Sequence, residues 1–332
     1  MKYLDEYRDP AAAQRMLDEI RRVSTGSWTL MEVCGGQTHS LLRHGIAAEL
    51  QGTVELIHGP GCPVCVTDQA DIDFACQLAK RPDVMVTSFG DMLRVPGSQG
   101  SLLDARTRVG FETTAPATAL AVKQAAQYQL DNFSLIVSHV RVQPAMESLV
   151  ESPENRVQAF LAAGHVCTVM GYESYNRLVE RYQLPVVVTG FEPLDLLEGI
   201  LACVRQLEAG ETRLENCYSR AVQVAGNLSA QDLVREIYQV SDARWRGFDL
   251  IPAGGLSLRE QWQQFDARVR FSDSSLPVIL NSECRSFDVM TGQLKPTECP
   301  HFGKQCTPET PLGAPMVSSE GACAAYYRYA GV

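Results

Sequence analysis

Short apolar segments alternate with amphipathic ones along most of the chain. Residues 10–23 follow Asp9-Pro10, a helix start signal, and carry one apolar stripe at helical spacing: Ala13, Met16, Leu17, Ile20 and Val23. Apolar runs that end in glycine, a thiol or a turn then predict five strands: Trp28–Val33, Val54–Ile57, Val84–Ser88, Ser134–Ser138 and Pro185–Thr189. The first two are followed by predicted helices, Thr38–Leu50 and Asp68–Lys80. This alternation predicts an α/β fold in which helices cover both faces of a parallel sheet.

A weak internal repeat divides the middle of the chain. Gly110-Phe111-Glu112 and Gly190-Phe191-Glu192 each precede a helical segment with proline near its first turn, ending at about Gln127 and Leu207. Two interpretations stay open. The repeat is either common α/β punctuation or the mark of two similar units that face each other across a cleft.

The last hundred or so residues change character. After a helical run at Ala230–Val240, prolines, glycines and turn residues are frequent and apolar periodicity is thin. Such a segment can barely build its own core, so something else is expected to order it.

Composition and charge exclude several classes of protein. The 332 residues are 45% hydrophobic and 20% charged, which is typical of a globular chain, and the formal net charge of −10 argues against nucleic-acid binding. No apolar run reaches the ~18–20 residues that span a membrane. The acidic, polar start MKYLDEYRDP does not resemble a secretory signal, so we expect a cytoplasmic protein.

The chain has 11 cysteines. In a reducing cytoplasm so many thiols indicate metal or redox chemistry for some of them. Cys76 and Cys203 lie among apolar residues at helical spacing, and burial as small hydrophobic side chains explains them better.

Four cysteines lie close together near the C-terminus. Cys284, Cys299, Cys306 and Cys323 are separated by 14, 6 and 16 residues. Four soft thiolates suit tetrahedral zinc or a four-iron cluster, and the lack of a tight Cys-x2–4-Cys knuckle favours the cluster. Four unrelated thiols remain the alternative.

Cys34 ends a predicted strand and precedes Gly35-Gly36 and a helix. The helix dipole and free amides there are expected to lower the pKa of the thiol. His39, on the first turn, could exchange a proton, although a capping or surface histidine is the other interpretation. A buried thiol at a strand end likewise remains open for Cys34.

Cys62 and Cys65 have the Cys-x-x-Cys spacing of a dithiol that can close to a disulfide. If their strand and the strand before Cys34 are parallel neighbours, both loops reach the same carboxyl edge of the sheet, where α/β proteins bind ligands. Three converging thiols predict a soft-metal or redox centre. Asp91 either ends a strand at this edge or caps a helix.

Six segments together resemble the HypD family of hydrogenase maturation proteins, nearly from end to end: MEVCGGQTHS, HGPGCPVC, SFGDMLRVPGSQGSLL, GFETTAP, GFEPLDLL and FGKQCTPETPLGAPMVSSEGACAAYY. The resemblance implies two similar parallel-sheet α/β domains with flanking helices, plus a C-terminal irregular and helical domain that carries a 4Fe–4S cluster. We set the expected limits at residues 1–107, 108–215 and 216–332. The resemblance also implies that the protein and the small chaperone HypC together form a scaffold for the Fe(CN)2CO fragment of nickel–iron hydrogenases. Cyanide would come from HypE, and the fragment would pass to the hydrogenase large subunit.

The resemblance also assigns roles to residues. Cys34 would hold the iron together with a HypC cysteine, Cys62 and Cys65 would be the redox pair, and Glu320 would serve proton or electron passage. The cluster ligands would be Cys284, Cys299, Cys306 and Cys323. A redox-active scaffold is the main expectation. The alternatives are a stand-alone Cys-x-x-Cys thiol–disulfide oxidoreductase with an iron–sulfur cluster and a scaffold whose cluster is purely structural.

The chain departs from the family pattern at two informative places. Gln37 stands where the family usually has histidine, so only His39 is carried over. At the junction of Arg108 and Val109 roughly thirty residues are missing, about one strand–helix–strand passage of a βαβ unit. Whether this junction is a real deletion stays open.

Overall fold

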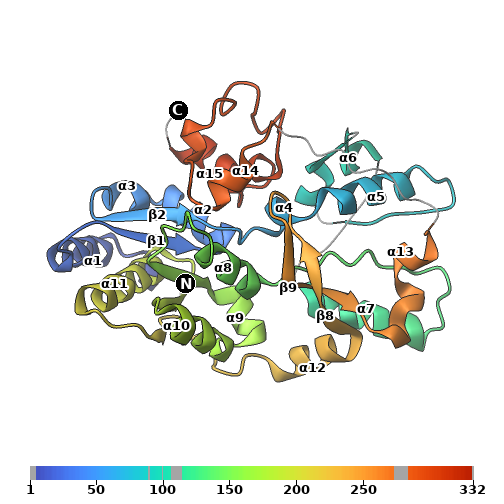
Figure 1. Cartoon of the computed structure of the whole chain (residues 1–332), viewed down its shortest axis with the longest axis horizontal. Helices are drawn as coiled ribbons and strands as arrows, with labels where there is room; N and C mark the ends of the chain where they lie inside the picture. The colour runs from blue at the N-terminus through green and yellow to red at the C-terminus, as the bar shows by residue number, and fades with distance from the viewer. Residues whose placement is uncertain (1–4, 89, 99, 106–113, 273–282, 331–332) are drawn as a thin grey trace.

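The computed structural model describes residues 5–88, 90–98, 100–105, 114–272 and 283–330. Its main sheet has five parallel strands in the order β2-β1-β5-β6-β7 (Figure 1). The strands are β1 (Trp28–Glu32), β2 (Val54–His58), β5 (Ala159–Ala163), β6 (Val186–Thr189) and β7 (Leu214–Asn216). The prediction of an α/β fold with a parallel sheet is therefore confirmed.

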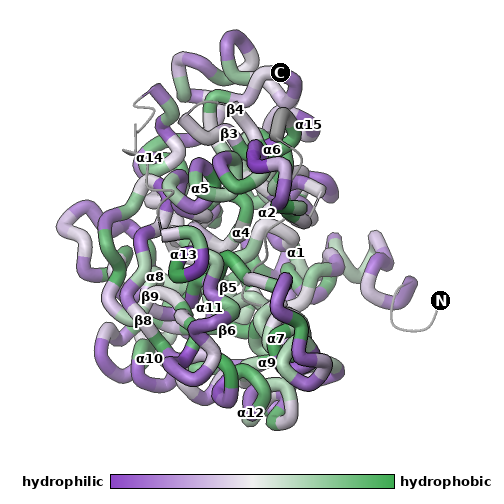
Figure 2. Tube along the Cα trace, turned by 90° about the vertical axis from the view of Figure 1, so that its right-hand side faces the viewer, coloured by the Kyte–Doolittle hydropathy of each residue, from purple (hydrophilic) through white to green (hydrophobic). Residues whose placement is uncertain are grey.

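Helices cover both faces of this sheet because successive strand residues point to opposite sides. Leu30, Leu161 and Val187 face one layer of helices, whereas Met31 and Phe160 face the other. The first layer consists of α1 (Pro10–Val23), α2 (Gly35–Arg43), α3 (Ile46–Glu49) and α11 (Pro193–Ala209). The second consists of α8 (Val142–Val150), α9 (Gly164–Met170) and α10 (Asn176–Tyr182). The buried strands β5 and β6 run as apolar segments inside the molecule (Figure 2).

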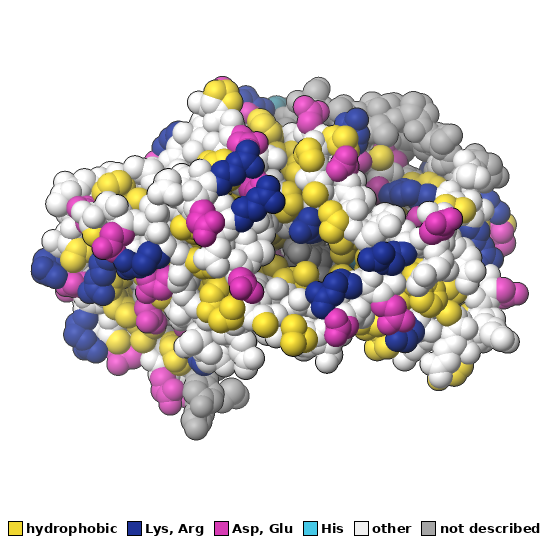
Figure 3. All heavy atoms as spheres, turned by 60° about the horizontal axis from the view of Figure 1, so that its bottom comes forward, with side chains coloured by type: hydrophobic (Ala, Val, Ile, Leu, Met, Phe, Trp, Pro, Cys, Tyr) yellow, Lys and Arg dark blue, Asp and Glu magenta, His cyan; other side chains and the backbone are white. Residues whose placement is uncertain are grey.

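A second region lies beside the sheet and has a different architecture. An antiparallel pair, β8 (Tyr238–Arg244) and β9 (Leu250–Leu258), packs with α7 (Ala115–Gln127) and α12 (Leu228–Ile237) around its own core. The remaining elements of this region are α4 (Pro63–Val66), α5 (Gln69–Ala79), η2 (Asp91–Arg94), β3 (Pro96–Gly97), β4 (Gly100–Ser101), α6 (Leu102–Ala105), η5 (Glu260–Phe265) and α13 (Ala267–Arg270). The underside of the molecule is hollowed, with apolar and basic side chains at the rim (Figure 3).

The strands of the five-stranded sheet come from both sides of the predicted limit at residues 107 and 108. That limit does not separate two sheets, because β5 pairs directly with β1. Within the described ranges the parallel sheet is single, and the expected second parallel sheet is replaced by the β8–β9 pair. The junction itself, and the Gly110-Phe111-Glu112 copy of the repeat, lie outside the described residues.

Several predicted elements differ in detail. Val84–Ser88 and Ser134–Ser138 are not strands; Thr87 and Leu135 form isolated bridges only. The helix predicted at Thr38–Leu50 breaks at Gly45, whose φ of 70° is left-handed and suits glycine. The helix predicted at Ala230–Val240 ends at Ile237 because β8 begins at the next residue.

The C-terminal segment lies over the edge of the sheet where β1 and β2 end (Figure 1). It consists of turns and short helices: α14 (Ser286–Met290), η6 (Pro296–Glu298), η7 (Ala314–Met316) and α15 (Ala322–Tyr329). Helix α15 packs against α2. Among the described helices, none combines the length and apolar character required to cross a bilayer.

Candidate functional site

Two loops meet at the carboxyl edge of the sheet. Strands β1 and β2 are parallel neighbours in register, with Glu32 opposite His58, so the loops that follow them start side by side. The Gly59 amide donates to the Glu32 carbonyl over 2.8 Å. A Cβ at Gly61 would overlap the Val33 carbonyl, so only glycine permits this close approach. The structure thus brings the dithiol loop against the backbone of Cys34.

Cys62 and Cys65 form a buried pair. Their exposed fractions are 4% and 2%, and the Cys65 amide donates to the Cys62 carbonyl over 3.0 Å at the single turn of α4. Burial raises the pKa of the Cys65 thiol, and the Cys62, Cys323 and Glu320 side chains raise it further. The pair is therefore shielded from water and electrostatically linked to one of the four C-terminal cysteines.

Cys34 is the residue before α2 and is 2% exposed. Its pKa is raised, which corrects the prediction of a lowered one. Burial is the largest cause of the raised pKa, and the nearby carboxylates of Glu32 and Glu320 raise it further. The Gln37 and Gly36 amides lower the pKa, as expected, but by less than burial raises it. Cys34 therefore needs a partner that takes its proton if it is to act as a thiolate.

The side chain next to the Cys34 thiol is that of His165, which the sequence analysis did not identify. Its Nδ1 lies 3.4 Å from the Cys34 Sγ. Burial lowers the pKa of His165 to about 4, so the imidazole is neutral near pH 7 and can share a hydrogen bond with the Cys34 thiol, but it is a weak base toward that thiol. His165 comes shortly after the fully apolar run Ala159–Ala163, which is followed by Gly164. An apolar run that stops at a glycine indicates another strand and its loop, and this pattern could have identified His165.

Glu32 is a fully buried carboxylate beneath Cys34. It accepts hydrogen bonds from the Cys34 amide at 2.8 Å and from the Thr38 hydroxyl, and its Oε1 lies 2.8 Å from His58 Nδ1. His58 Nε2 in turn lies 3.2 Å from the Tyr326 hydroxyl of α15. This network fixes the start of α2 and ties the sheet edge to the C-terminal segment.

The C-terminal segment also contacts His39 of α2 and contributes Glu320 to this edge of the sheet. His39 Nδ1 lies 3.1 Å from the Ser319 carbonyl, and its Nε2 lies 3.2 Å from the Tyr329 hydroxyl. Both ring nitrogens therefore face the C-terminal segment, whereas Cys34 has His165 as its neighbour. Glu320 packs against Gly35, and burial followed by the charge of Asp91 raises the pKa of its carboxyl group.

Asp91 joins the same group of residues. It is the first residue of the short helix η2, so it neither ends a strand nor serves as the cap, a position taken by Gly90. The Ser318 hydroxyl donates to Asp91 Oδ2 over 2.7 Å. His39, Asp91 and Glu320, predicted from separate motifs, thus gather around Ser318–Glu320.

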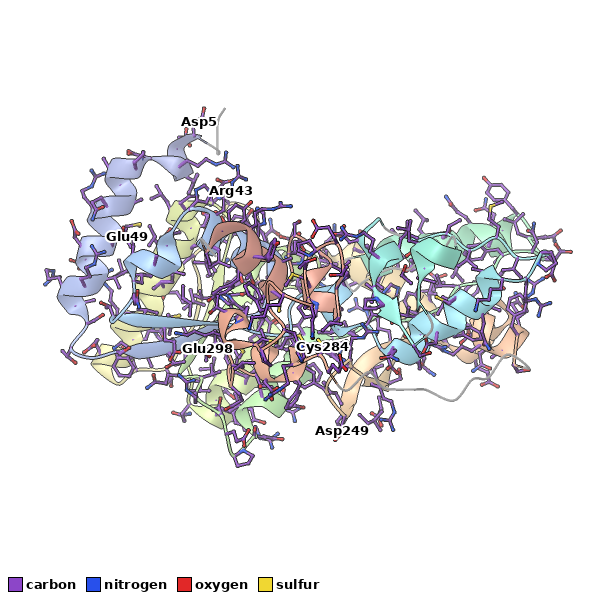
Figure 4. All side chains as sticks on the ribbon, turned by 90° about the horizontal axis from the view of Figure 1, so that it is seen from above. Asp5, Arg43, Glu49, Asp249, Cys284 and Glu298 are labelled. Carbon is purple, nitrogen blue, oxygen red and sulfur yellow. The ribbon has the colours of Figure 1, made fainter. Side chains whose placement is uncertain are left out.

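The four C-terminal cysteines line one pocket of about 360 Å³, counted with its opening to solvent. Figure 4 shows Cys284 near the middle of the molecule, among the elements of the C-terminal segment. Among the described residues, no three His, Cys, Asp or Glu side chains are grouped closely enough to hold a single metal ion. A pocket lined by four thiols has the donor set that suits either a zinc ion or a four-iron cluster.

Local contacts favour sulfur at these positions. A Cβ at Gly313 would overlap the Cys284 Sγ, and the Leu312 amide donates to the Cys306 Sγ over 3.4 Å. Burial raises the pKa of the Cys323 thiol, and the other three cysteines raise it further because their negative forms would repel one another. A cationic group bound by all four would relieve that repulsion. His301 lines the pocket, but its Nδ1 lies 2.7 Å from Gln305 Oε1.

Comparisons with known proteins agree with the sequence motifs. A family model described as "HypD: Hydrogenase formation hypA family" matches residues 11–109 and 107–330. The chain is 41% identical to the hydrogenase maturation factor HypD of Escherichia coli (strain K12), covering 99% of the chain and 98% of the relative. It is 40% identical to HypD of Rhodobacter capsulatus, with 100% and 99% covered, and to HypD of Azotobacter vinelandii, with 99% and 97% covered.

The same comparisons bear on the junction near Arg108. The first two alignments span 366 and 372 positions although the chain has 332 residues, so each relative contains positions with no counterpart here. The family match divides at residues 107–109, which is where the motifs predicted missing residues.

Proposed function

The chain belongs to the HypD family and has a role in hydrogenase maturation, and from that premise we propose that it is a redox scaffold for the Fe(CN)2CO fragment of nickel–iron hydrogenases. The observation that carries this proposal is the meeting of Cys34 with the Cys62–Cys65 pair at one sheet edge, with neutral His165 beside Cys34. The proposed iron-holding thiol and the proposed two-electron dithiol would thereby be adjacent.

Cys34 is the proposed iron ligand. Iron that carries cyanide and carbon monoxide is low-spin and prefers soft, strong donors, so a thiolate suits it better than carboxylates. His165 would take the thiol proton as the sulfur binds iron, and the Glu32 network would keep α2 in place. The small chaperone HypC is the proposed source of a second thiolate.

The dithiol is the proposed electron source for cyanide transfer. Release of cyanide from a thiocyanate on HypE gives a thiol and cyanide, and it consumes two electrons and a proton. Oxidation of Cys62 and Cys65 to a disulfide supplies two electrons and two protons. Glu320, whose raised pKa favours its protonated form, lies near both Cys34 and Cys65 and is a suitable proton carrier.

Cys284, Cys299, Cys306 and Cys323 are the proposed ligands of a 4Fe–4S cluster. When bound, such a cluster would supply electrons one at a time. The position of Cys323 near Cys65 supports a path from that pocket to the dithiol. We place this chemistry in the cytoplasm, where eleven cysteines would stay reduced until used. The finished fragment would pass to the hydrogenase large subunit.

Anaerobic co-purification with HypC followed by infrared spectroscopy tests the main proposal. We expect bands from iron-bound cyanide and carbon monoxide, lost in Cys34→Ala and retained in the control Cys217→Ala, since Cys217 packs against a different core cluster from the dithiol. An intact complex without such bands would refute the scaffold.

A second experiment separates the relay from the alternative of a stand-alone oxidoreductase. In Cys62→Ser we expect intact cluster absorbance and no cofactor assembly. Normal hydrogenase maturation in this variant would rule out the relay. Turnover of small dithiol substrates without a partner protein would favour the oxidoreductase, although the near-complete burial of both thiols is against it.

A further inference from the structure

Arg246 lies in the turn between β8 and β9, and this turn contacts both redox elements. Its backbone amide donates to the Val66 carbonyl over 2.8 Å, which fixes the turn to the end of the dithiol helix α4. On its other side, the next residue, Gly247, contacts Phe287 of α14, next to residues that line the four-cysteine pocket. In Figure 4 the tip of this hairpin, marked by Asp249, reaches toward Cys284.

The Arg246 guanidinium is enclosed there. Its Nη2 donates to the Pro96 carbonyl over 2.5 Å, whereas its buried Nε has no hydrogen-bond partner among the described residues. Cys62, Cys65 and Met290 belong to the same apolar cluster as Trp245, the residue before Arg246. An arginine keeps its charge at any physiological pH, so a full positive charge is held in a largely apolar environment.

The groups that face this charge are acidic or can become anionic. Burial lowers the pKa of Arg246, but Cys284, Asp68, Asp73 and Cys65 each raise it, in that order. Neither aspartate forms an ion pair with Arg246 within the described ranges; the Asp73 carboxylate instead accepts from the Ser98 amide over 2.7 Å. A half-buried cation without an ion-pair partner among the described residues is costly unless negative charge develops beside it.

We propose that Arg246 is the fixed counter-charge of the redox path, holding negative charge on the four-cysteine pocket and on the dithiol. Arg246 is a positioning residue: it touches no substrate and acts through Cys284 and Cys65. A buried positive charge favours the more reduced, more negative state of a cluster held by four thiolates, so it raises the reduction potential. This inference rests on the proposed cluster.

Potentiometric titration of the anaerobically purified full chain, followed by electron paramagnetic resonance, tests it. We expect the ratio of reduced to oxidised cluster in Arg246→Gln to fall at least tenfold at a given potential, which is 59 mV for one electron. Arg246→Lys keeps the charge and should stay within about threefold of the unmodified chain. Arg244→Gln removes an exposed arginine at the end of β8, two residues before Arg246, and should change nothing.

A second readout follows the dithiol. Peptide-resolved alkylation by iodoacetamide at one fixed pH should label Cys65 at least tenfold more slowly in Arg246→Gln, because less of the thiol is ionised. Arg246→Lys and Arg244→Gln should again match the unmodified chain.

The possible outcomes separate this inference from the proposed function. A chain without any cluster would overturn both. A cluster whose potential is equal in Arg246→Gln and the unmodified chain would overturn the role of Arg246 alone. Equal shifts in Arg246→Lys and Arg246→Gln would also overturn it, since guanidinium hydrogen bonds and not charge would then matter. If Arg246→Gln fails to hold the cluster, Arg246→Lys must hold it at the unmodified potential for the inference to stand.

Discussion

The Nδ1 atom of His165 lies 3.4 Å from the Sγ atom of Cys34, although the two residues are 131 positions apart in the chain. The sheet order explains their meeting, because β5, which leads into His165, pairs with β1, which leads into Cys34. The thiol is buried and has a raised pKa, and the imidazole is neutral. At pH 7 the pair is therefore a neutral thiol beside a neutral imidazole, and a cation bound at the sulfur would favour loss of the thiol proton.

Replacing His165 with glutamine is therefore expected to impair Cys34. Without the hydrogen bond from the imidazole, which can stabilise the thiolate, alkylation of Cys34 at pH 7 should slow by about tenfold, the usual scale of one hydrogen bond to a charged group. Peptide-resolved mass spectrometry after timed iodoacetamide treatment measures this rate.

His44→Gln is the control for this prediction, because His44 is exposed at the end of α2. Its Cys34 labelling rate should equal that of the unmodified chain. A rate in His165→Gln that equals the control rate would mean that His165 only packs against Cys34.

The four-cysteine pocket predicts a dependence of bound iron on each thiol. The anaerobically reconstituted chain should contain roughly four iron atoms, and Cys284→Ser and Cys323→Ser should retain less than about one. Iron and sulfide analysis with visible absorbance measures this. Cys217→Ser, a substitution far from the pocket, should keep the full iron content; a matching loss there would point to general unfolding.

The sequence predicted the site better than it predicted the sheet. Each of the motifs around Cys34, Cys62 and Cys65 follows a strand whose boundaries apolar patterning defines, and parallel pairing then brings their loops together. Strand β5 was missed because Ala159–Ala163 is a short, fully apolar run, and periodicity alone does not distinguish such a run from a buried helical segment. His165 was missed with it.

Other differences arise from tertiary contacts that local patterns do not contain. Val84–Ser88 has strand-forming residues, but a strand also needs a neighbour along its length, and among the described residues only Thr87 has a bridge. The prediction that the pKa of Cys34 is lowered was wrong for a similar reason. The helix start lowers it as expected, but the depth of burial, which the C-terminal segment helps to create, is the larger effect.

Tyr238 stabilises the second region, and this stabilisation is lost at alkaline pH. The side chain is 2% exposed and donates to Thr118 Oγ1 over 2.8 Å. Burial raises the pKa of Tyr238 to about 12, partly offset by Thr118, compared with about 10 in an unfolded chain. Because the folded chain holds this proton more tightly, the stabilisation is complete below pH 10 and is lost as the pH rises to 12, by about 2–3 kcal/mol in all.

Urea unfolding at pH 9 and pH 11 tests this dependence. The advantage of the unmodified chain over Tyr238→Phe should shrink by about 1 kcal/mol between the two values, since phenylalanine does not ionise. Tyr128→Phe removes a hydroxyl from a tyrosine that is 68% exposed and should show no such change. An advantage that is constant with pH would contradict the assignment.

The packing of Gly61 against Val33 predicts that one methyl group disturbs the site. In Gly61→Ala the added Cβ would overlap the Val33 carbonyl and the Cys34 amide, which are backbone atoms that cannot rotate away. We expect the free energy of unfolding to fall by about 1–3 kcal/mol, as for other overpacked positions. The dithiol loop should also move away from Cys34, so co-purification with HypC should yield less iron-bound cyanide even where the chain folds. Gly26→Ala is the matched control, because a Cβ at Gly26 meets nothing within 4 Å. If Gly61→Ala is as stable as Gly26→Ala and assembles the same amount of cofactor, the close contact between the two loops is not required for the proposed function.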